Sequence, residues 1–177
     1  MRFTPPRQLD LPRFSLRAWT VADAGRLRAA LDASDAHLRA WTPWVIDGRV
    51  PGLTLEQRLE RHAADFATGT EWVFGMFSAD GNQVLGGCGL YARVGPRALE
   101  IGYWLAAAHT GRGLATDAAS LLTGLAFESP DVDEVQIRCD PSNAASARVP
   151  RRIGYRLDGG GALDVWRITR AMPRGPR

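Results

Sequence analysis

The chain contains 177 residues, of which 45% are hydrophobic and 23% charged, and these proportions are typical of one globular domain. They exclude an intrinsically disordered polymer and a collagen, and two cysteines are too few for a disulfide-stapled scaffold. The formal net charge is +3, and all 22 basic residues are arginine. Uniform arginine either serves phosphate binding or reflects a biased codon composition, and the second interpretation is favoured.

The sequence carries no sign of export, membrane insertion or metal binding. No N-terminal segment combines a basic end, an apolar stretch and a cleavage site, and the longest apolar runs are far shorter than a membrane span. The two cysteines, Cys88 and Cys139, lack the spacing of metal ligands. We therefore expect a cytoplasmic protein with no membrane partner and no metal.

The predicted elements begin with a strand at Phe14–Trp19, where apolar and polar residues alternate. A helix follows from Thr20, and a second helix begins at Thr54, which forms a capping-box pair with Gln57. The remaining predicted elements are strands at 72–78, 84–92 and 99–105, a helix at 113–127, a strand at 135–139, a helix at 143–152, and strands at 155–158 and 163–169. Short turns join the three middle strands, which indicates an antiparallel meander. The fold class is α/β, with a mixed, mostly antiparallel central sheet flanked by helices.

One domain accounts for this order. We expect residues 1–12 to form a lead-in, residues 13–170 the domain, and residues 171–177 a basic flexible tail. Four arginines and no acid fall between Arg167 and Arg177. Such a tail suits RNA or an acidic partner, but a solvated terminus is favoured because prolines and glycine discourage packing. No aromatic residues interleave with these arginines, so no nucleic-acid partner is expected.

The segment that carries the chemistry is the strand Glu100–Leu105 followed by the loop Gly111–Thr116, which opens a helix. The first N–H groups of a helix have no partner within it, and the helix dipole favours negative charge at that end. The glycines let the backbone approach a phosphate closely, and Arg112 adds a cation. The loop is neither a Walker A motif nor a GxGxxG fingerprint. A plain tight connection is the alternative interpretation of such a loop.

The order of the motifs makes the pattern more specific. From Phe14 to Thr169 the sequence resembles the GNAT acyl-CoA N-acyltransferases, and within them the RimJ/RimL-like branch. The marks of this resemblance are Leu16-Arg17-Ala18-Trp19 with Asp23-Ala24, Leu38-Arg39-Ala40-Trp41-Thr42-Pro43-Trp44, Glu100–Leu105, Gly111–Thr116, and Asn143-Ala144-Ala145-Ser146 followed by Ile153-Gly154-Tyr155.

The resemblance implies acetyl-CoA, or another acyl-CoA, as the co-substrate. In the family, the main chain of the loop cradles the pyrophosphate, the end of the preceding strand bonds the pantetheine arm, and an asparagine also contacts pantetheine. The residues that this implies here are Gly111, Arg112, Gly113, Leu114, Ala115 and Thr116 for the loop, Trp104, Leu105 and Ala106 for the strand end, and Asn143. This chain departs from the family pattern at Thr110, where relatives carry Arg or Gln, and at Ala107, often Pro. The missing long side chain removes one phosphate contact.

The catalytic candidates are Glu100 as the base, directly or through a water, and Ser146 as the acid for the departing thiolate. Resemblance favours both, because related enzymes place a carboxylate on this strand and some present a serine in the Asn-x-x-Ser motif. The alternatives are an exposed acid at the start of a strand for Glu100 and an ordinary first-turn serine for Ser146. Asn143 is alternatively only a helix cap.

Three further residues bear on the chemistry. Pro150 falls in the last predicted helix and removes the N–H that would bond the Ser146 carbonyl, so we expect a kink or an early end that shifts Ser146. Tyr155 is a reserve acid or, as favoured, a core residue. Cys139 offers a covalent route, but a small buried thiol is favoured.

By resemblance, Trp41 and Trp44 border the cleft for the acceptor amine, although they could instead cover the core edge. The expected activity is direct acyl transfer to a primary amine in a ternary complex, preferably to a protein N-terminal α-amine. A small-molecule amine is the alternative acceptor, and a non-catalytic acyl-CoA sensor is the alternative class. Only Asp47 is acidic between Trp41 and Pro51, which disfavours a polycationic substrate. The sequence leaves open whether the protein forms a homodimer.

Overall fold

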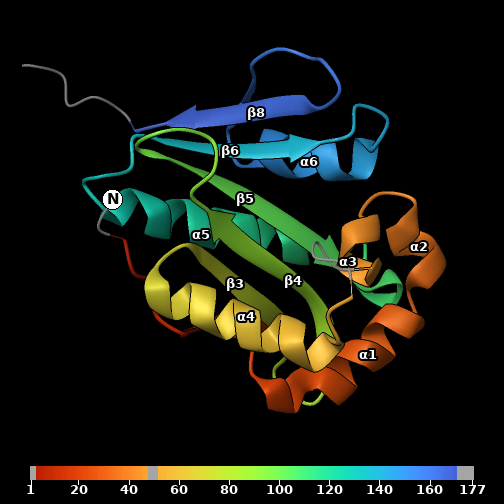
Figure 1. The fold of residues 1–177 in the computed structure, drawn as a ribbon. Coiled ribbons are helices and arrows are strands. Elements are labelled where there is room, and N and C mark those ends of the chain that lie inside the picture. The colour runs from red at the N-terminus through yellow and green to blue at the C-terminus, as the bar shows by residue number, and fades with distance from the viewer. Residues whose placement is uncertain (1–2, 48–51, 171–177) are drawn as a thin grey trace, which may run out of the picture.

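The computed structural model describes residues 3–47 and 52–170 of the chain. The strands are β1 (Gln8–Asp10), β2 (Phe14–Ala18), β3 (Glu71–Ser78), β4 (Val84–Tyr91), β5 (Ala98–Leu105), β6 (Glu134–Cys139), β7 (Arg156–Leu157) and β8 (Asp164–Thr169). The helices are α1 (Ala24–Asp32), α2 (Asp35–Arg39), α3 (Pro43–Asp47), α4 (Leu55–Thr68), α5 (Leu114–Glu128) and α6 (Ala144–Arg152), with short 3-10 helices η1 (Val21–Asp23) and η2 (Ala107–His109). Figure 1 shows their arrangement around one sheet.

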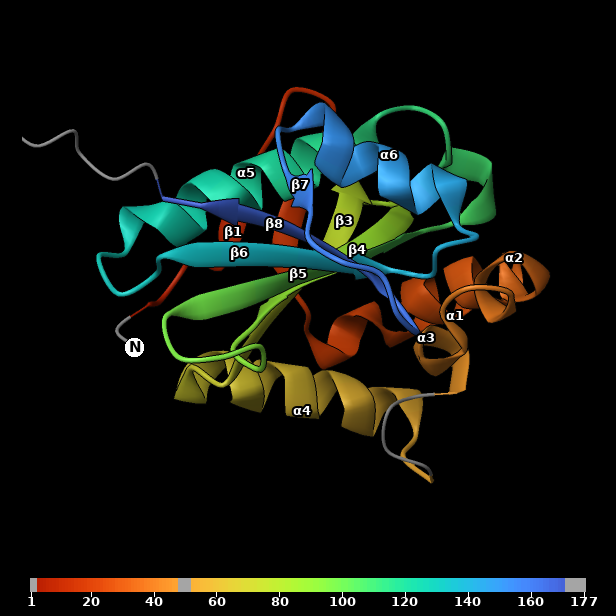
Figure 2. The same cartoon turned by 90° about the horizontal axis from the view of Figure 1, so that it is seen from above.

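The sheet has the strand order β1-β2-β3-β4-β5-β6-β8-β7, and every pair is antiparallel except β5 with β6. Figure 2 shows α5 and α6 over one face and α1 to α4 over the other. The predicted fold class, a mostly antiparallel sheet flanked by helices, is therefore confirmed. Within the described ranges, no helix is both long and apolar enough to span a membrane.

Strand β5 contributes to the core on both faces because its side chains alternate. Leu99 and Ile101 pack in the cluster that includes Leu122 of α5. The side chain of Trp104 lies on the opposite face and packs against the second cluster, which contains residues of α1 and α4 such as Leu27. Two hydrophobic cores therefore lie on opposite faces of one sheet.

The central feature of the sheet is the separation of β5 from β6. Their parallel pairing ends at Ile101 and Ile137, although β5 continues to Leu105 and β6 to Cys139. Beyond that point β5 still pairs with β4, and β6 still pairs with β8. Figure 1 shows the two strands diverging. The end of β5 therefore has one open edge inside the sheet.

The structure contains elements that the sequence did not predict. In the stretch expected as a lead-in, β1 pairs with β2, and Phe3 is buried with its ring centroid 4.7 Å from that of Trp72. Helices α2 and α3 were not predicted, since short helices carry little periodicity. The predicted capping box at the start of α4 is confirmed: Thr54 and Gln57 bond each other reciprocally. The predicted tail, residues 171–177, lies outside the described residues.

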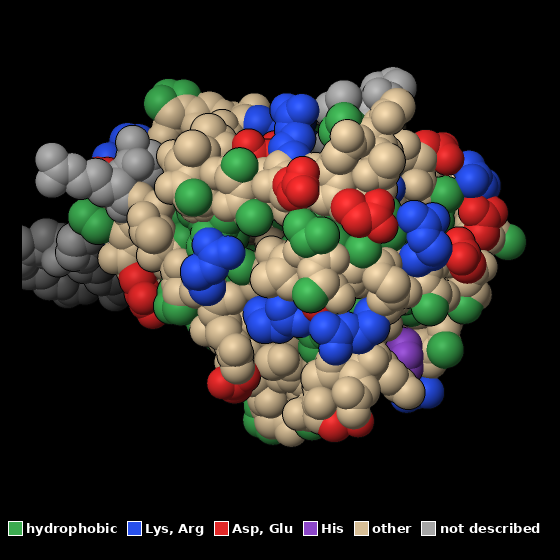
Figure 3. All heavy atoms as spheres, turned by 60° about the horizontal axis from the view of Figure 1, so that its bottom comes forward, with side chains coloured by type: hydrophobic (Ala, Val, Ile, Leu, Met, Phe, Trp, Pro, Cys, Tyr) green, Lys and Arg blue, Asp and Glu red, His purple; other side chains and the backbone are tan. Residues whose placement is uncertain are grey.

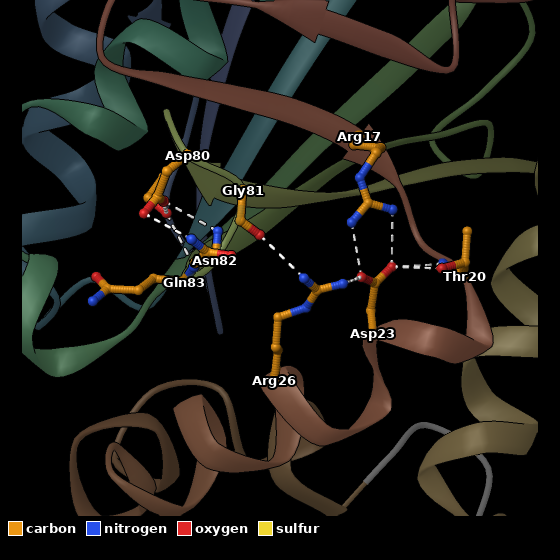
Figure 4. A network of polar contacts seen from close by, with 9 residues as sticks. Arg17, Thr20, Asp23, Arg26, Asp80, Gly81, Asn82 and Gln83 are labelled. Atoms are coloured by element: carbon orange, nitrogen blue, oxygen red, sulfur yellow. Dashed lines mark hydrogen bonds and ion pairs between the residues drawn. The ribbon is translucent and has the colours of Figure 1, made fainter.

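A buried ion cluster fixes η1 and α1 against the sheet (Figure 4). Asp23 is fully buried and accepts two hydrogen bonds from Arg17, one from Arg26, and others from the backbone and hydroxyl of Thr20. Arg26 also donates to the carbonyl of Gly81, in the turn between β3 and β4. Burial by itself raises the pKa of Asp23, but the bonds from Arg17 and Thr20 outweigh it and lower that pKa to about 2.

Candidate active site

A cavity of about 1010 Å³ passes through the split between β5 and β6. It is lined from one face of the sheet by Trp19 and Leu27 and from the other by Ala115 and Ser146. The cavity is large enough for a drug-sized or cofactor-sized ligand. Two molecules that enter from opposite faces could therefore meet at the level of the sheet.

The open edge of β5 offers main-chain groups to an extended ligand. The N–H of Ala106 donates to the carbonyl of Leu85, 2.9 Å away, so that group points toward β4. Main-chain groups alternate sides along a strand, and those of Tyr103 and Leu105 consequently face the gap. Of the predicted pantetheine contacts, Leu105 keeps its main chain free for the ligand. Trp104 contributes its side chain to the lining, and the N–H of Ala106 is already used within the sheet.

The loop before α5 has the conformation that an anion site requires. Gly111 and Gly113 have φ of 72° and 81°, which glycine adopts without steric cost. Gly113 is the N-cap residue and has no side chain to accept from the first turn. The intrahelical bonds begin with the Asp117 N–H on the Gly113 carbonyl, so the N–H groups of 114–116 have no acceptor one turn earlier. These groups are the ones predicted to bind pyrophosphate.

An arginine from outside the loop contacts it. Arg13 donates to the carbonyl of Arg112 at 2.7 Å and forms an ion pair with Asp117 at 2.6 Å, and these bonds fix the loop from outside. The side chain of Arg112 is exposed and is not among the described residues that line the cavity, whereas Arg148 and Arg152 of α6 are among the arginines that do. The sequence interpretation chose Arg112 because it lies within the motif. The i, i+4 spacing of the two α6 arginines was the signal for the other cations.

Glu100 faces the α1 and α4 side of the cavity, but it is not the exposed acid of the alternative interpretation. Its side chain is buried, and each carboxylate oxygen accepts from Arg93, at 3.0 and 2.7 Å. Arg93 in turn lies over the ring of Tyr91, 4.4 Å from the ring centroid, and Arg138 approaches Glu100 to 3.9 Å. Each oxygen retains a second lone pair for a water or an amine.

Ser146 lies on the other side of β5, in the first turn of α6. Its N–H donates to Asn143 Oδ1 at 3.0 Å, so Asn143 caps the helix, and its contact with pantetheine stays a prediction. Its Oγ lies 3.1 Å from Tyr103 Oη, and both residues line the cavity. Sequence reasoning missed Tyr103. The alternation of β5 was the available signal, because it places residues 101, 103 and 105 on the face toward α5.

Tyr155 lies in the core, and Cys139 is a buried thiol beside the cavity. The hydroxyl of Tyr155 lies 2.6 Å from Thr123 Oγ1 in the core, and Tyr155 is not among the described residues that line the cavity. Cys139 is buried, and burial raises the pKa of its thiol, which disfavours the thiolate needed for a covalent route. The favoured interpretations, core tyrosine and buried thiol, are confirmed. Burial and the nearby Arg112 lower the pKa of His109, which favours the neutral form of its ring.

The outer end of the cavity, toward α2 and α3, is aromatic and half exposed. Trp41 and Trp44 line it with 37% and 48% of their surfaces exposed. Arg58 of α4 holds α3 in place by donating to the carbonyls of Val45 and Ile46, at 2.7 and 3.1 Å. An aromatic rim of this kind can receive an extended chain or a ring by stacking and apolar contact.

Comparison with known proteins agrees with this geometry. The sequence profile described as "Acetyltransferase (GNAT) domain" matches residues 13–156. The chain belongs to the GNAT acetyltransferase family. A curated relative, "Probable N-acetyltransferase YjcK" of Bacillus subtilis, is 28% identical over 125 residues, or 69% of this chain. The match spans 65% of that relative's own length.

Solved structures share the fold of this GNAT domain. The microcin C7 self-immunity acetyltransferase MccE, in complex with acetyl-CoA and AMP, aligns with a TM-score of 0.81 at 15% identity, over 93% of this chain and 97% of that one. RimL, the ribosomal L7/L12 α-N-protein acetyltransferase, aligns with a TM-score of 0.75 at 20% identity, over 90% and 95% of the two chains. The RimL structure holds coenzyme A as a disulfide with a cysteine of that protein.

Proposed function

We propose that this GNAT protein transfers the acetyl group of acetyl-CoA directly to a primary amine, preferably the α-amine of a protein N-terminus. The observation that carries the proposal is the cavity through the split sheet. At one end of it lie the open edge of β5 and the free first-turn N–H groups of α5, and at the other an aromatic rim. Two substrates entering from opposite sides form a ternary complex without a covalent enzyme intermediate.

In this mechanism the amine nitrogen attacks the thioester carbon, the C–N bond forms, and the C–S bond breaks with its electron pair on sulfur. The main-chain groups at the end of β5 polarise the carbonyl. Glu100, through a water held on a free lone pair, takes the proton that the nitrogen loses. Ser146 donates its hydroxyl proton to the sulfur and recovers one from solvent. An α-amine with a pKa near 8 is roughly 10–20% neutral at pH 7, so it needs little from the base.

The structural neighbours support the choice of acceptor, since RimL acts on a ribosomal protein α-amine. The mixed charge of the α1 and α4 face supports it as well. Figure 3 shows arginine and acidic side chains interspersed there, without an extended acidic patch that would attract a polycation. The ion pair between Glu100 and Arg93 favours the second candidate, a sensor that binds acyl-CoA without turnover, because it engages the proposed base.

The experiment is thiol release from acetyl-CoA with N-terminal peptides, aminoglycosides and polyamines, together with calorimetric titration of coenzyme A. We expect coenzyme A binding and release with the N-terminal peptides. Release with another amine class would identify a small-molecule acceptor instead. Binding without release from any of these amines would favour the sensor, and the absence of binding would contradict the proposal.

A further inference from the structure

Pro150 lies inside α6 and leaves one main-chain carbonyl of that helix without its usual partner. The N–H of residue 150 would bond the carbonyl of residue 146, but proline has no N–H. An unpaired carbonyl in a part-buried position costs about as much as a lost hydrogen bond. The helix nevertheless continues from Ala144 to Arg152, so of the two expected outcomes, a kink or an early end, the early end does not occur. Another donor must therefore reach the Ser146 carbonyl.

Tyr103 supplies that donor across the gap between β5 and α6. Its Oη lies 3.1 Å from the Ser146 carbonyl oxygen and 3.1 Å from Ser146 Oγ. The carbonyl can only accept, so the single phenolic proton is best used there, and the phenolic oxygen remains an acceptor. The Ser146 hydroxyl is then the donor of the second bond. One tyrosine thus satisfies the carbonyl that Pro150 leaves open and holds the serine hydroxyl in place.

The phenol keeps its proton under neutral conditions. Burial raises the pKa of Tyr103, and the hydrogen bond with Ser146 offsets only part of that rise. Tyr103 is consequently a poor proton donor in a reaction and a steady hydrogen-bond donor to the carbonyl. Tyr155 provides a natural comparison, because burial raises its pKa as well while its hydroxyl bonds Thr123 rather than Ser146.

We infer that Tyr103 is a positioning residue that holds the Ser146 hydroxyl where it can turn to the departing sulfur, and that Pro150 is what commits Tyr103 to this task. The inference rests on the proposed function, since the task exists only if Ser146 serves the thiolate. Before reaction, the Ser146 hydroxyl donates a hydrogen bond to Tyr103 Oη. A thiolate is charged and accepts more strongly than a phenol oxygen, so the hydroxyl turns to it while Tyr103 stays on the carbonyl.

The kinetic test compares Tyr103→Phe, Ser146→Ala and the double variant, using thiol release from acetyl-CoA. We expect Tyr103→Phe to lower kcat about tenfold and to leave the KM for acetyl-CoA within about twofold, because a lost orienting bond acts on the transition state. The double variant should be no slower than Ser146→Ala alone, since the two residues act as a unit. Tyr155→Phe is the matched control and should keep the parental kcat.

The structural test uses Pro150→Ala, which restores an N–H one turn after Ser146. We expect Tyr103→Phe to lower the melting temperature less in the Pro150→Ala background than in the parent, because the helix can then satisfy its own carbonyl. Equal losses in both backgrounds would overturn the link between Pro150 and Tyr103.

The outcomes separate this inference from the proposed function. Wild-type protein that releases no thiol with any acceptor, or Ser146→Ala with parental kcat, would mean that the proposed chemistry or its acid fails, and the positioning role with it. An impaired Ser146→Ala beside a Tyr103→Phe of parental kcat would overturn the positioning role alone. A loss in Tyr155→Phe equal to that in Tyr103→Phe would also overturn it, because any buried phenol would then have the same effect.

Discussion

Two buried carboxylates among the described residues are bonded to arginine, and we expect them to serve different ends. Asp23 is fully buried, bonds two arginines and Thr20, and is not among the described residues that line the cavity. Glu100 bonds one arginine through both of its oxygens and lines the cavity. A buried ion pair is thus no sign of function by itself. The two carboxylates differ in that Glu100 borders the cavity and Asp23 does not. The comparison predicts a loss of stability at Asp23 and a loss of turnover at Glu100.

The largest expected effect belongs to Asp23→Asn. The variant leaves Arg17 and Arg26 without their shared anion, and breaking a buried pair costs about 3–5 kcal/mol. The free energy of unfolding, measured by urea denaturation, should fall by about that amount, while kcat of the folded fraction stays unchanged. A variant as stable as the parent would show that the cluster of Figure 4 contributes little.

Glu100→Gln should show the opposite pattern. We expect kcat to fall about 100-fold, the usual size of a general-base contribution, with a smaller loss of stability. Thiol release with an N-terminal peptide measures the effect. Glu134→Gln is the matched control, because Glu134 also pairs with an arginine, Arg167 at 3.0 Å, and is not among the described residues that line the cavity. Similar kcat values for the two variants would remove Glu100 from the mechanism.

The pH dependence of stability sharpens the same comparison. The pKa of Asp23 falls from 3.8 to about 2 on folding, so the ionised form is favoured in the folded state. Its contribution, about 2 kcal/mol, is complete above about pH 4 and is lost as the pH falls toward 2. Urea denaturation between pH 2 and pH 6 should show this loss in the parent and not in Asp23→Asn. Parallel curves for the two proteins would contradict the assignment.

A smaller effect is expected at the loop before α5. Gly111 and Gly81 have nearly equal φ, 72° and 71°, and a Cβ at either position meets nothing within 4 Å. Alanine should strain both positions by about 1–2 kcal/mol, and the two melting temperatures should fall alike. Only Gly111→Ala should weaken coenzyme A binding, by several-fold, as calorimetry would show. Equal affinities would argue that the loop does not hold the pyrophosphate.

The sequence predicted the elements that local chemistry determines. The period of apolar residues placed α4, α5 and β3 to β6, and the capping box of Thr54 and Gln57 placed the start of a helix. Strand β1 was not predicted, because its three residues lie between two prolines and are too few to show an alternation of polar and apolar side chains. Its place depends on β2 and on the burial of Phe3, which are contacts of the folded chain.

The site was predictable in its main chain and less so in its side-chain pairs. The glycines of the loop follow from the motif, since only their conformation is needed. The bond between Tyr103 and Ser146 joins residues 43 positions apart, and no spacing in the sequence indicates it. Arg93 as the partner of Glu100 depends likewise on the register of β4 and β5. Pro150 was recognised as a departure from the family pattern. The donor that replaces its missing N–H, the hydroxyl of Tyr103, lies on β5 and was not predicted.

The most direct test of the account is hydrogen–deuterium exchange of the intact protein with and without coenzyme A. We expect coenzyme A to bind along the open edge of β5 and at the first turn of α5. Exchange should therefore slow in peptides that cover 103–106 and 111–117, and it should not change in β1. Coenzyme A binding that leaves both segments unprotected would contradict the central claim that the split sheet is the acyl-CoA site.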